Sequence, residues 1–470
     1  MVYRILTWFL RAVARVFFRQ VEVVGLEHVP AAGPVLFVGN HPNSLIDPIL
    51  IITTCGRKVH FAAKDTLFKG RLMRGLLRGL GAVPLARKVE HDGKPADAAT
   101  AAVRDPSEMA RLNDAAFDSM FTVLAGGGTI GIFPEGLSHD ASQLARFKTG
   151  AARLALGGST RTSAPLAVVP CGLTFIHPKR FRSRVLVQYG PPLLVEGSTE
   201  PDQVKRVTGE IEQALRRLTI NAPDWDTVRA LDTVRRLYQP HGIAIEDRVE
   251  LARRFNTHYT AVADDPRVVA VMARVRDYQQ RLDELGLADR ELARDLTKRE
   301  IAARMLRHVV LLVWWLPLTV PAAPLHVPPL IFARLAGPRL TPRKDVVATT
   351  KMLVGMLLVL LSYALAVAYA WWRLGPWWGA FAMLLVPISG WATLRVLDRF
   401  RLVRRAFGVL GRRLRFRREV RALRAERAGL AQDVIRVVGQ LLPRDLEPLF
   451  PASHPQRLDD EAATRDPASP

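Results

Sequence analysis

Short apolar runs alternate with amphipathic stretches over the first half of this chain. Residues 35–38 and 129–133 form two of these runs, and each leads directly into polar residues. Short apolar runs bounded by turn residues are typical of buried strands, and strands that alternate with helical stretches favour an α/β fold. We therefore predict an α/β domain over residues 21–220, with the polar residues in loops at strand ends.

The longest apolar runs lie in the last third of the chain. Residues 352–372 and 374–394 carry no formal charge, and about twenty apolar residues are enough to cross a membrane as a helix. Arg373 and four tryptophans cluster between the two runs, as in an interfacial aromatic belt. Basic residues flank the pair, so we predict a transmembrane helical hairpin with both ends cytoplasmic. A buried hairpin in a soluble core is the alternative.

An earlier segment, residues 309–333, is equally apolar but contains five prolines. Proline inside a helix removes a hydrogen bond and clashes with the preceding turn. We therefore predict that this part of the membrane region 308–397 dips into the membrane. If it crossed once instead, the basic stretch 334–351 would face the far side, or the whole orientation would flip.

The other parts of the chain have simpler patterns. Residues 1–20 mix apolar side chains with arginines and predict a basic amphipathic helix at the membrane interface, with a core-packing helix as the alternative. Residues 221–307 predict a charged helical region. Residues 398–470 predict a basic cytoplasmic helix and, from Pro451, a disordered tail. Residues 91–106 predict a surface insertion.

The charge balance narrows the choice of partners. A formal net charge of +23 implies an anionic partner, either nucleic acid or a membrane surface. Arginines crowd the stretch directly beyond the second apolar run, and a polybasic segment beside a membrane helix is typical of contact with lipid headgroups. We therefore expect anionic membrane lipids and no nucleic acid. The catalytic domain is expected on the cytoplasmic face of the inner or cell membrane. Cys55 and Cys171 fit a reduced compartment and predict neither a disulfide nor a metal site.

Two polar segments carry the candidate chemistry. They read Asn40-His41-Pro42-Asn43-Ser44-Leu45-Ile46-Asp47 and Phe133-Pro134-Glu135-Gly136-Leu137-Ser138-His139-Asp140. An alcohol is a poor nucleophile at neutral pH, and a neutral imidazole within hydrogen-bond reach can take its proton. His41 is the candidate base, and Asp47 is the candidate carboxylate that fixes the ring tautomer and stabilises the imidazolium. No covalent intermediate with the protein is required, because the activated hydroxyl can itself attack.

The spacing of this pair constrains its geometry. Five residues separate His41 from Asp47, and a six-residue step turns a helix by about 600°, so the two side chains cannot meet on one regular helix. Pro42 favours an extended conformation at His41. We predict His41 in a loop and Asp47 in the first turn of the following helix.

The two segments resemble the NHx(4)D and FPEG boxes of the PlsC-like glycerolipid acyltransferases, with one extra residue in the first box. Two further blocks, Gly81-Ala82-Val83-Pro84-Leu85-Ala86-Arg87 and Ala167-Val168-Val169-Pro170, follow the order of that family. The continuation Leu137-Ser138-His139-Asp140 and the later Lys148-Thr149-Gly150 are similar to fungal-type glycerol-3-phosphate and dihydroxyacetone-phosphate acyltransferases and their bacterial relatives.

The resemblance implies a fold and a set of site residues. The fold is an α/β acyltransferase domain with a mixed sheet flanked by helices, followed here by the helical region and the membrane hairpin. Arg87 would bind the acceptor's phosphate, and Glu135 would orient the acceptor's hydroxyls or that arginine. The second box lacks the arginine that commonly follows it, and Lys148 or Arg146 could replace that cation. Gly136 and Ser138 complete the expected acceptor site.

The expected activity is transfer of a fatty acyl group from acyl-CoA or acyl carrier protein to a hydroxyl of glycerol 3-phosphate or 1-acylglycerol 3-phosphate. Dihydroxyacetone phosphate is a third acceptor that the residues leave open, as they do the oligomeric state. No cofactor beyond the acyl thioester is expected. The alternatives are acylation of a non-glycerol lipid alcohol, and a non-catalytic lipid-binding or membrane-remodelling role.

Overall fold

The computed structural model of the chain divides into two compact units. The first comprises Met1–Thr219 together with Arg343–Thr349, and the second comprises Ile220–Pro342 and Thr350–Pro470. The structure describes residues 1–68, 70–85, 106–162, 165–238, 245–292, 298–341 and 343–441. The predicted insertion and the predicted disordered tail lie outside the described residues, apart from Pro106, which begins a helix.

The first unit is built on a mixed sheet with the strand order β1-β7-β6-β2-β5-β3-β4, and β8 pairs with β6. The neighbours of β2, which are β5 and β6, both run parallel to it, whereas β7 and β8 pair with β6 antiparallel. The strands are β1 (Phe18–Val24), β2 (Val35–Gly39), β3 (Val59–Lys64), β4 (Val83–Leu85), β5 (Thr129–Ile132), β6 (Leu166–Phe175), β7 (Ser183–Tyr189) and β8 (Leu193–Val195). The predicted fold class is confirmed.

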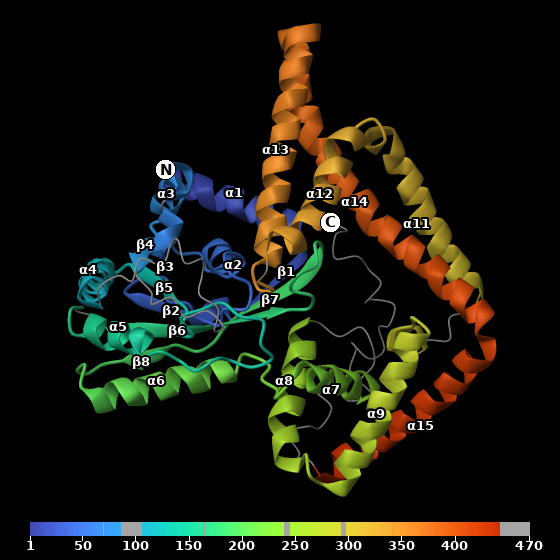
Figure 1. The fold of residues 1–470 in the computed structure, drawn as a ribbon, viewed down its shortest axis with the longest axis horizontal. Helices are drawn as coiled ribbons and strands as arrows, with labels where there is room; N and C mark the ends of the chain where they lie inside the picture. The colour runs from blue at the N-terminus through green and yellow to red at the C-terminus, as the bar shows by residue number, and fades with distance from the viewer. Residues whose placement is uncertain are drawn as a thin grey trace. The chain divides into compact units, whose positions relative to one another are not determined.

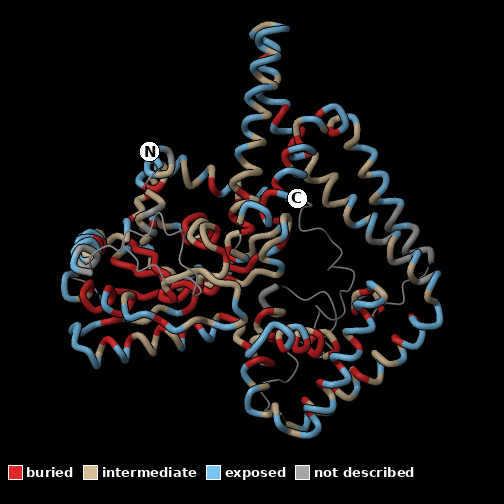
Figure 2. The backbone as a smooth tube through the Cα atoms, in the orientation of Figure 1, coloured by how far each residue is buried: buried red, intermediate tan, exposed pale blue. Residues whose placement is uncertain are grey.

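Helices cover both faces of this sheet (Figure 1). They are α1 (Val2–Phe17), α2 (Ile46–Thr54), α3 (Arg71–Gly79), α4 (Pro106–Ala125), α5 (Gly150–Ser159) and α6 (Pro201–Arg216). Because side chains alternate along a strand, Leu36 and Val38 of β2 join a core with α4, α5 and α6. Phe37 instead packs on the ring of Tyr189, whose hydroxyl hydrogen-bonds Thr54 at the end of α2. Both faces of the central strands are therefore buried (Figure 2).

Helix α1 is shorter than the predicted amphipathic segment, because Phe18 already begins the edge strand β1. One side of the helix packs into the unit through Leu10, Ala14 and Phe17, which are buried. The opposite side leaves Trp8 largely exposed, together with Val2 and Ile5. The helix therefore both packs on the core and presents an apolar side to its surroundings.

The second unit contains the helical region expected from the sequence and one further helix. Its helices α7 (Trp225–Tyr238), α8 (Ile245–Val262), α9 (Pro266–Glu284), α10 (Asp289–Leu292) and α15 (Arg417–Leu441) share one apolar core. Two contacts on Asp289 join α9 and α15: the Tyr278 hydroxyl donates at 2.9 Å and the Arg427 guanidinium at 2.8 Å. Residues 417–441 thus belong with the helical region, because the apolar residues on one face of α15 are buried: Val420, Leu423, Leu430, Val434 and Val438.

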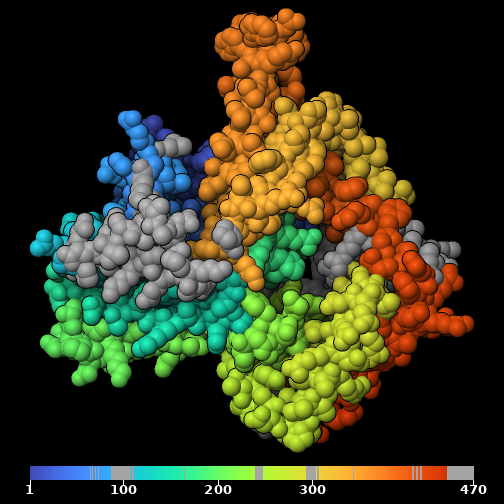
Figure 3. Space-filling model, in the orientation of Figure 1, coloured from blue at the N-terminus to red at the C-terminus, as the bar shows by residue number. Residues whose placement is uncertain are grey.

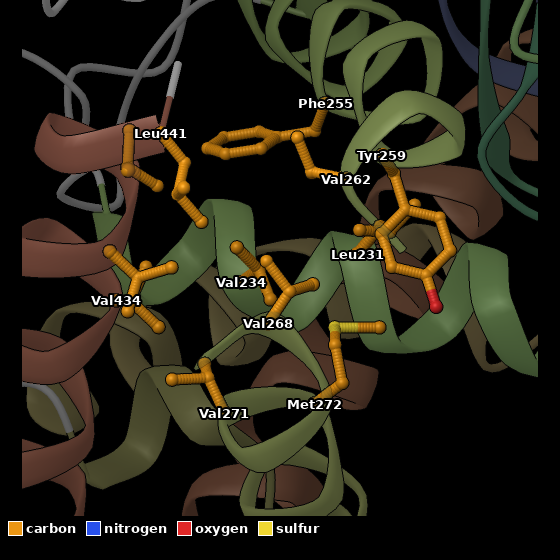
Figure 4. A pocket seen from close by; sticks show the side chains of 12 residues that line it. Leu231, Val234, Phe255, Tyr259, Val262, Val268, Val271, Met272, Val434 and Leu441 are labelled. Atoms are coloured by element: carbon orange, nitrogen blue, oxygen red, sulfur yellow. The ribbon is translucent and has the colours of Figure 1, made fainter. Parts of the chain in front are cut away.

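A small apolar pocket opens within this helical core (Figure 4). Hydrocarbon and thioether side chains surround it, and the Tyr259 hydroxyl is the only polar side-chain group in the lining. The lining residues are Leu231, Val234, Phe255, Tyr259, Val262, Val268, Val271, Met272, Val434, Val437, Val438 and Leu441. Such a lining can accept an apolar group but offers no group for acid or base chemistry.

Two helices of the described chain are long and apolar enough to cross a membrane. They are α13 (Val347–Leu374) and α14 (Pro376–Arg415), with candidate spans at Val347–Leu374 and Pro376–Arg404. Trp372 and Trp377, near the turn between these helices, are exposed. The orange part of the chain in Figure 3 contains this turn. The second helix continues to Arg415, well beyond the predicted end, because residues 395–415 contain no proline and are rich in the good helix formers leucine and arginine.

The proline-rich segment is bent in the structure. It lies in α11 (Lys298–Thr319) and α12 (Ala323–Leu340), and Leu306–Thr319 and Ala323–Leu340 meet at an angle of 106°. The bend is typical either of a broken span or of a re-entrant loop. The predicted dip into the membrane therefore stays a prediction.

A side chain at Gly131 is expected to destabilise the first unit. A Cβ atom there would lie 2.4 Å from the ring of buried Phe61, so Gly131→Ala should cost about 1–3 kcal/mol, as overpacking usually does. Gly209→Ala in α6 is the matched control, because nothing lies within 4 Å of its Cβ position and alanine there should stabilise by up to about 1 kcal/mol. Denaturant unfolding of solubilised protein measures both variants. Wild-type stability of Gly131→Ala would contradict the packing argument.

Candidate active site

The two polar segments meet at one edge of the sheet. The segment that carries His41 follows β2, and the segment that carries Glu135 follows β5. These strands are parallel neighbours, with Val38 opposite Ile132 in the register. Their carboxyl ends therefore lie side by side, which is where ligands bind in most open α/β sheets.

His41 and Asp47 form a close pair. Nδ1 of the imidazole lies 2.9 Å from Oδ2 of the carboxylate, with His41 in the loop and Asp47 in the first turn of α2, as the sequence predicts. A carboxylate at Nδ1 favours the tautomer with its proton there, so Nε2 is the basic nitrogen. Asp47 is fully buried, and its other oxygen, Oδ1, has no hydrogen-bond partner among the described residues.

The environment of Asp47 opposes a lone negative charge. Burial raises the pKa of this carboxyl well above its ordinary value, although the Asn43 amide, which donates to Oδ2 at 2.7 Å, lowers it. The neighbouring carboxylates of Glu135 and Asp345 raise the pKa further. A charge on Asp47 is therefore costly beside a neutral imidazole and becomes favourable when His41 takes up a proton.

A left-handed turn accommodates the extra residue of the first box. Ser44 has a φ of 51°, a conformation that residues other than glycine adopt rarely. The amides of Ile46 and Asp47 donate to the carbonyls of Asn43 and Ser44 in the same turn. The chain thereby reverses before α2 begins, so the Asp47 side chain points back to His41.

An aromatic ring fixes the plane of the imidazole. Phe133 stacks on His41 with the ring centroids 4.1 Å apart and the planes 4° from parallel. Phe61 stacks in turn on Phe133, with the two ring centroids 5.5 Å apart. The sequence gives no sign of this role for Phe133, because nothing in a linear pattern shows which ring stacks on the histidine.

Glu135 joins the two segments. Its Oε1 accepts the His41 amide at 2.8 Å, and its Oε2 accepts the Ala145 amide at 2.8 Å and the Nε2–H of His139. The carboxylate is 2% exposed. These contacts hold the His41 backbone and His139 in place, and the orientation of the acceptor's hydroxyls or of an arginine by Glu135 stays a prediction.

His139 belongs to the site, although its position in the sequence is equally consistent with an ordinary loop residue. Its amide donates to the His41 carbonyl at 3.2 Å. The hydrogen bond to Glu135 raises the pKa of His139, and partial burial opposes that shift. Next to it, Asp140 forms an ion pair with Lys179 at 2.5 Å.

A segment far along the chain completes this edge. Asp345 accepts the Ser138 hydroxyl at 2.5 Å, across 207 residues of sequence. Arg343 donates to the carbonyl and the hydroxyl oxygen of Ser138, at 3.1 Å each. Thr349 donates to the Asn43 carbonyl at 3.3 Å. No local pattern predicts these contacts, because the partners belong to widely separated parts of the sequence.

The other expected residues have different outcomes. Lys148 packs its side chain over Gly136, whose φ of 72° is one that residues with a side chain rarely adopt. The Lys148 amide donates to the Pro134 carbonyl at 2.8 Å. Arg87 lies outside the described residues.

Burial raises the pKa of Cys55 to about 11, which opposes a nucleophilic thiolate. Within the described residues, no three His, Cys, Asp or Glu side chains are grouped as metal ligands.

The fold and the pair of boxes define an acyltransferase domain. Residues 20–174 match the family model described as Acyltransferase, and residues 230–446 match the model described as Glycerol-3-phosphate acyltransferase 2 C-terminal domain. Residues 20–174 therefore form an acyltransferase domain, and residues 230–446 match a glycerol-3-phosphate acyltransferase 2 C-terminal domain. The predicted family resemblance is confirmed for these two parts of the chain.

Several known proteins are similar to this chain or to parts of it. Glycerol-3-phosphate O-acyltransferase 2 of Saccharomyces cerevisiae is 32% identical over 280 residues, which are 53% of this chain and 37% of that protein. The chain thus spans little more than a third of that relative. An uncharacterized acyltransferase of Schizosaccharomyces pombe is 25% identical over 97% of this chain and 83% of its own length. The crystal structure of the 1-acyl-sn-glycerophosphate acyltransferase PlsC from Thermotoga maritima aligns with a TM-score of 0.34 and 21% identity, over 45% of this chain and 76% of that one.

The raised pKa of His139 predicts a pH-dependent contribution to stability. A histidine whose folded-state pKa lies above its ordinary value of about 6.5 stabilises fully below that pH and loses its contribution as the pH rises through the folded-state pKa. The advantage of wild type over His139→Gln in unfolding midpoint should therefore be largest near pH 6 and shrink toward about pH 9.

His60 supplies the opposite control. Burial lowers its pKa, so the advantage of wild type over His60→Gln should be smaller at acidic pH and grow as the pH rises toward about 6.5. The same trend in both variants would contradict the assignment of His139 to a charged pair with Glu135.

Proposed function

We propose that the protein transfers a fatty acyl group from an acyl thioester to a hydroxyl of a glycerol-phosphate-type acceptor. The observation that carries this proposal is the His41–Asp47 pair, 2.9 Å apart and stacked on Phe133 of the second box. A base oriented by a buried carboxylate is what an alcohol nucleophile requires.

The pair accounts for each proton in the reaction. Nε2 of His41 takes the proton of the acceptor hydroxyl as its oxygen attacks the thioester carbonyl carbon, and Asp47 stabilises the resulting imidazolium. The tetrahedral intermediate then collapses with cleavage of the carbon–sulfur bond, and the leaving thiolate takes the proton from His41. The products are an ester and a free thiol, and no bond to the enzyme forms.

The second box forms the acceptor side in this proposal. Ser138 and Gly136 line the loop after β5, and exposed Lys148 lies across Gly136 as a cation for the acceptor's phosphate. Arg87 is proposed as a further phosphate ligand on the resemblance alone. Glycerol 3-phosphate is the favoured acceptor, because a similar yeast protein is named for it. The proposal includes both acyl-CoA and acyl carrier protein as donors of the acyl group.

The membrane is proposed as the working surface of the enzyme. Helices α13 and α14 would cross it as a hairpin with both ends cytoplasmic, since arginines follow the second span. The exposed apolar side of α1, with Trp8 beside Arg4 and Arg15, would lie among anionic headgroups. An amphiphilic acyl product resides in the membrane, so the proposed location agrees with the proposed activity.

The catalytic roles predict a strong loss of turnover. Replacing a general base usually lowers the rate by about 100- to 10,000-fold. We therefore expect His41→Ala to lower turnover by at least about 100-fold and Asp47→Asn to lower it by a smaller factor. Labelled long-chain acyl-CoA, with glycerol 3-phosphate and 1-acylglycerol 3-phosphate offered separately, measures the rates in membranes. His258→Ala, on α8, is the control and should keep wild-type turnover. Unchanged turnover in His41→Ala would exclude this mechanism and favour a non-catalytic lipid-binding role.

The proposed hairpin predicts which sites a membrane-impermeant thiol reagent reaches from outside. Both native cysteines are buried, so an introduced cysteine is labelled over a low background. Trp377→Cys, at a position 87% exposed in the turn between the spans, should react in intact cells. Arg339→Cys should react only after the membrane is opened. Labelling of Arg339→Cys from outside would reverse the assignment and make the bent segment a crossing.

A further inference from the structure

Arg343–Thr349 is part of the first compact unit, although the rest of that unit ends at Thr219. The segment lies within the residues that match the C-terminal family model. It contacts both boxes of the site: Asp345 and Arg343 bond to Ser138, and Thr349 bonds to the Asn43 carbonyl. A part of the C-terminal domain's sequence therefore forms part of the catalytic edge.

The guanidinium of Arg343 is held in one orientation. Its Nη2 lies 2.7 Å and its Nε 3.2 Å from the two oxygens of Asp345, and Nη2 also donates to Ser138. Two contacts to one carboxylate fix the plane of the group. The side chain of Asp345 is 7% exposed, whereas that of Arg343 is 39% exposed. The carboxylate is thus a buried support, and the cation is accessible to a ligand.

The negative charges near the site favour a positively charged group beside Ser138. Asp47, Glu135 and Asp345 are all buried carboxylates at the edge where a phosphorylated acceptor would approach. A dianionic phosphate beside them requires positive groups to offset the repulsion. The second box continues from Gly136 as Leu137-Ser138-His139, without an arginine, and Arg343 is the guanidinium that lies against Ser138.

Resting on the proposed function, we propose that Arg343 binds the phosphate of the acceptor and that Asp345 positions it for that role. The amide of His139, which follows Ser138, bonds to the His41 carbonyl, so the phosphate contact and the base are joined by one short stretch of backbone. The acceptor's phosphate would rest on Arg343 while its hydroxyl faces His41. Arginine suits this task, because its planar fork matches phosphate oxygens.

The test separates phosphate binding from support of the loop. Charged hydrogen bonds lost from a bound substrate weaken binding by about ten- to hundredfold. Arg343→Gln should therefore raise the KM for glycerol 3-phosphate by about that factor with a smaller change in kcat, and Arg343→Lys should restore part of the loss. The preference for glycerol 3-phosphate over unphosphorylated glycerol should fall by the same factor. Lys344→Gln, which removes an exposed charge from the next residue, should behave as wild type.

Two further measurements keep the outcome decisive. The double variant Arg343→Gln/Asp345→Asn leaves no buried carboxylate unpaired, so its KM defect should match that of Arg343→Gln if the phosphate contact is what was lost. Glycerol 3-phosphate should also raise the unfolding temperature of the full-length wild type and of Lys344→Gln, but not of Arg343→Gln. This binding readout holds even if no acyl transfer is found, so it distinguishes failure of the proposed function from failure of the phosphate site. An unchanged KM with reduced kcat, equal losses with glycerol, or wild-type protection of Arg343→Gln would overturn the proposal.

Discussion

Burying a carboxylate is costly unless its oxygens are hydrogen-bonded, and Glu135 has donors from both sides of the site. It accepts the backbone amide of His41 from the first box, a hydrogen bond from His139 of the second box, and the Ala145 amide from the residues that follow. Removing one of these donors would leave the buried Glu135 carboxylate with fewer hydrogen bonds. The two loops are therefore held in register by one ion, and the positions of His41, His139 and Ser138 follow from it.

Much of the catalytic domain could be predicted from the linear pattern. The strands that end before His41 and Glu135 were located by their short apolar runs, and parallel neighbours bring such ends together. The spacing of His41 and Asp47 excludes a shared helix and predicts His41 in a loop and Asp47 in the first turn of a helix, as the structure shows. These inferences succeeded because they depend on local spacing and on the regular geometry of helices and strands.

Other features depend on contacts between distant residues, which a single sequence does not display. The ring of Phe133 reads as an ordinary core residue until its stacking on His41 is seen. Arg343 and Asp345 read as flanking residues of a membrane helix, although they bond to Ser138. The helix Arg417–Leu441 reads as a basic tail because arginines dominate its composition, yet its apolar face packs on α7 and α9. The C-terminal boundaries were therefore predicted less well than the catalytic domain.

Arg343–Thr349 belongs to the first unit, although residues 220–342 belong to the second, so the first unit is discontinuous in sequence. A fragment that stops at Thr219 lacks a piece of its own domain, however well its sheet is formed. Val347 also begins α13, which is long and apolar enough to cross a membrane, so a segment that contacts both boxes continues directly into an apolar helix. Replacing the part of this chain that follows Thr219 would therefore also replace Arg343–Thr349, and with it the contacts to Ser138 and Asn43.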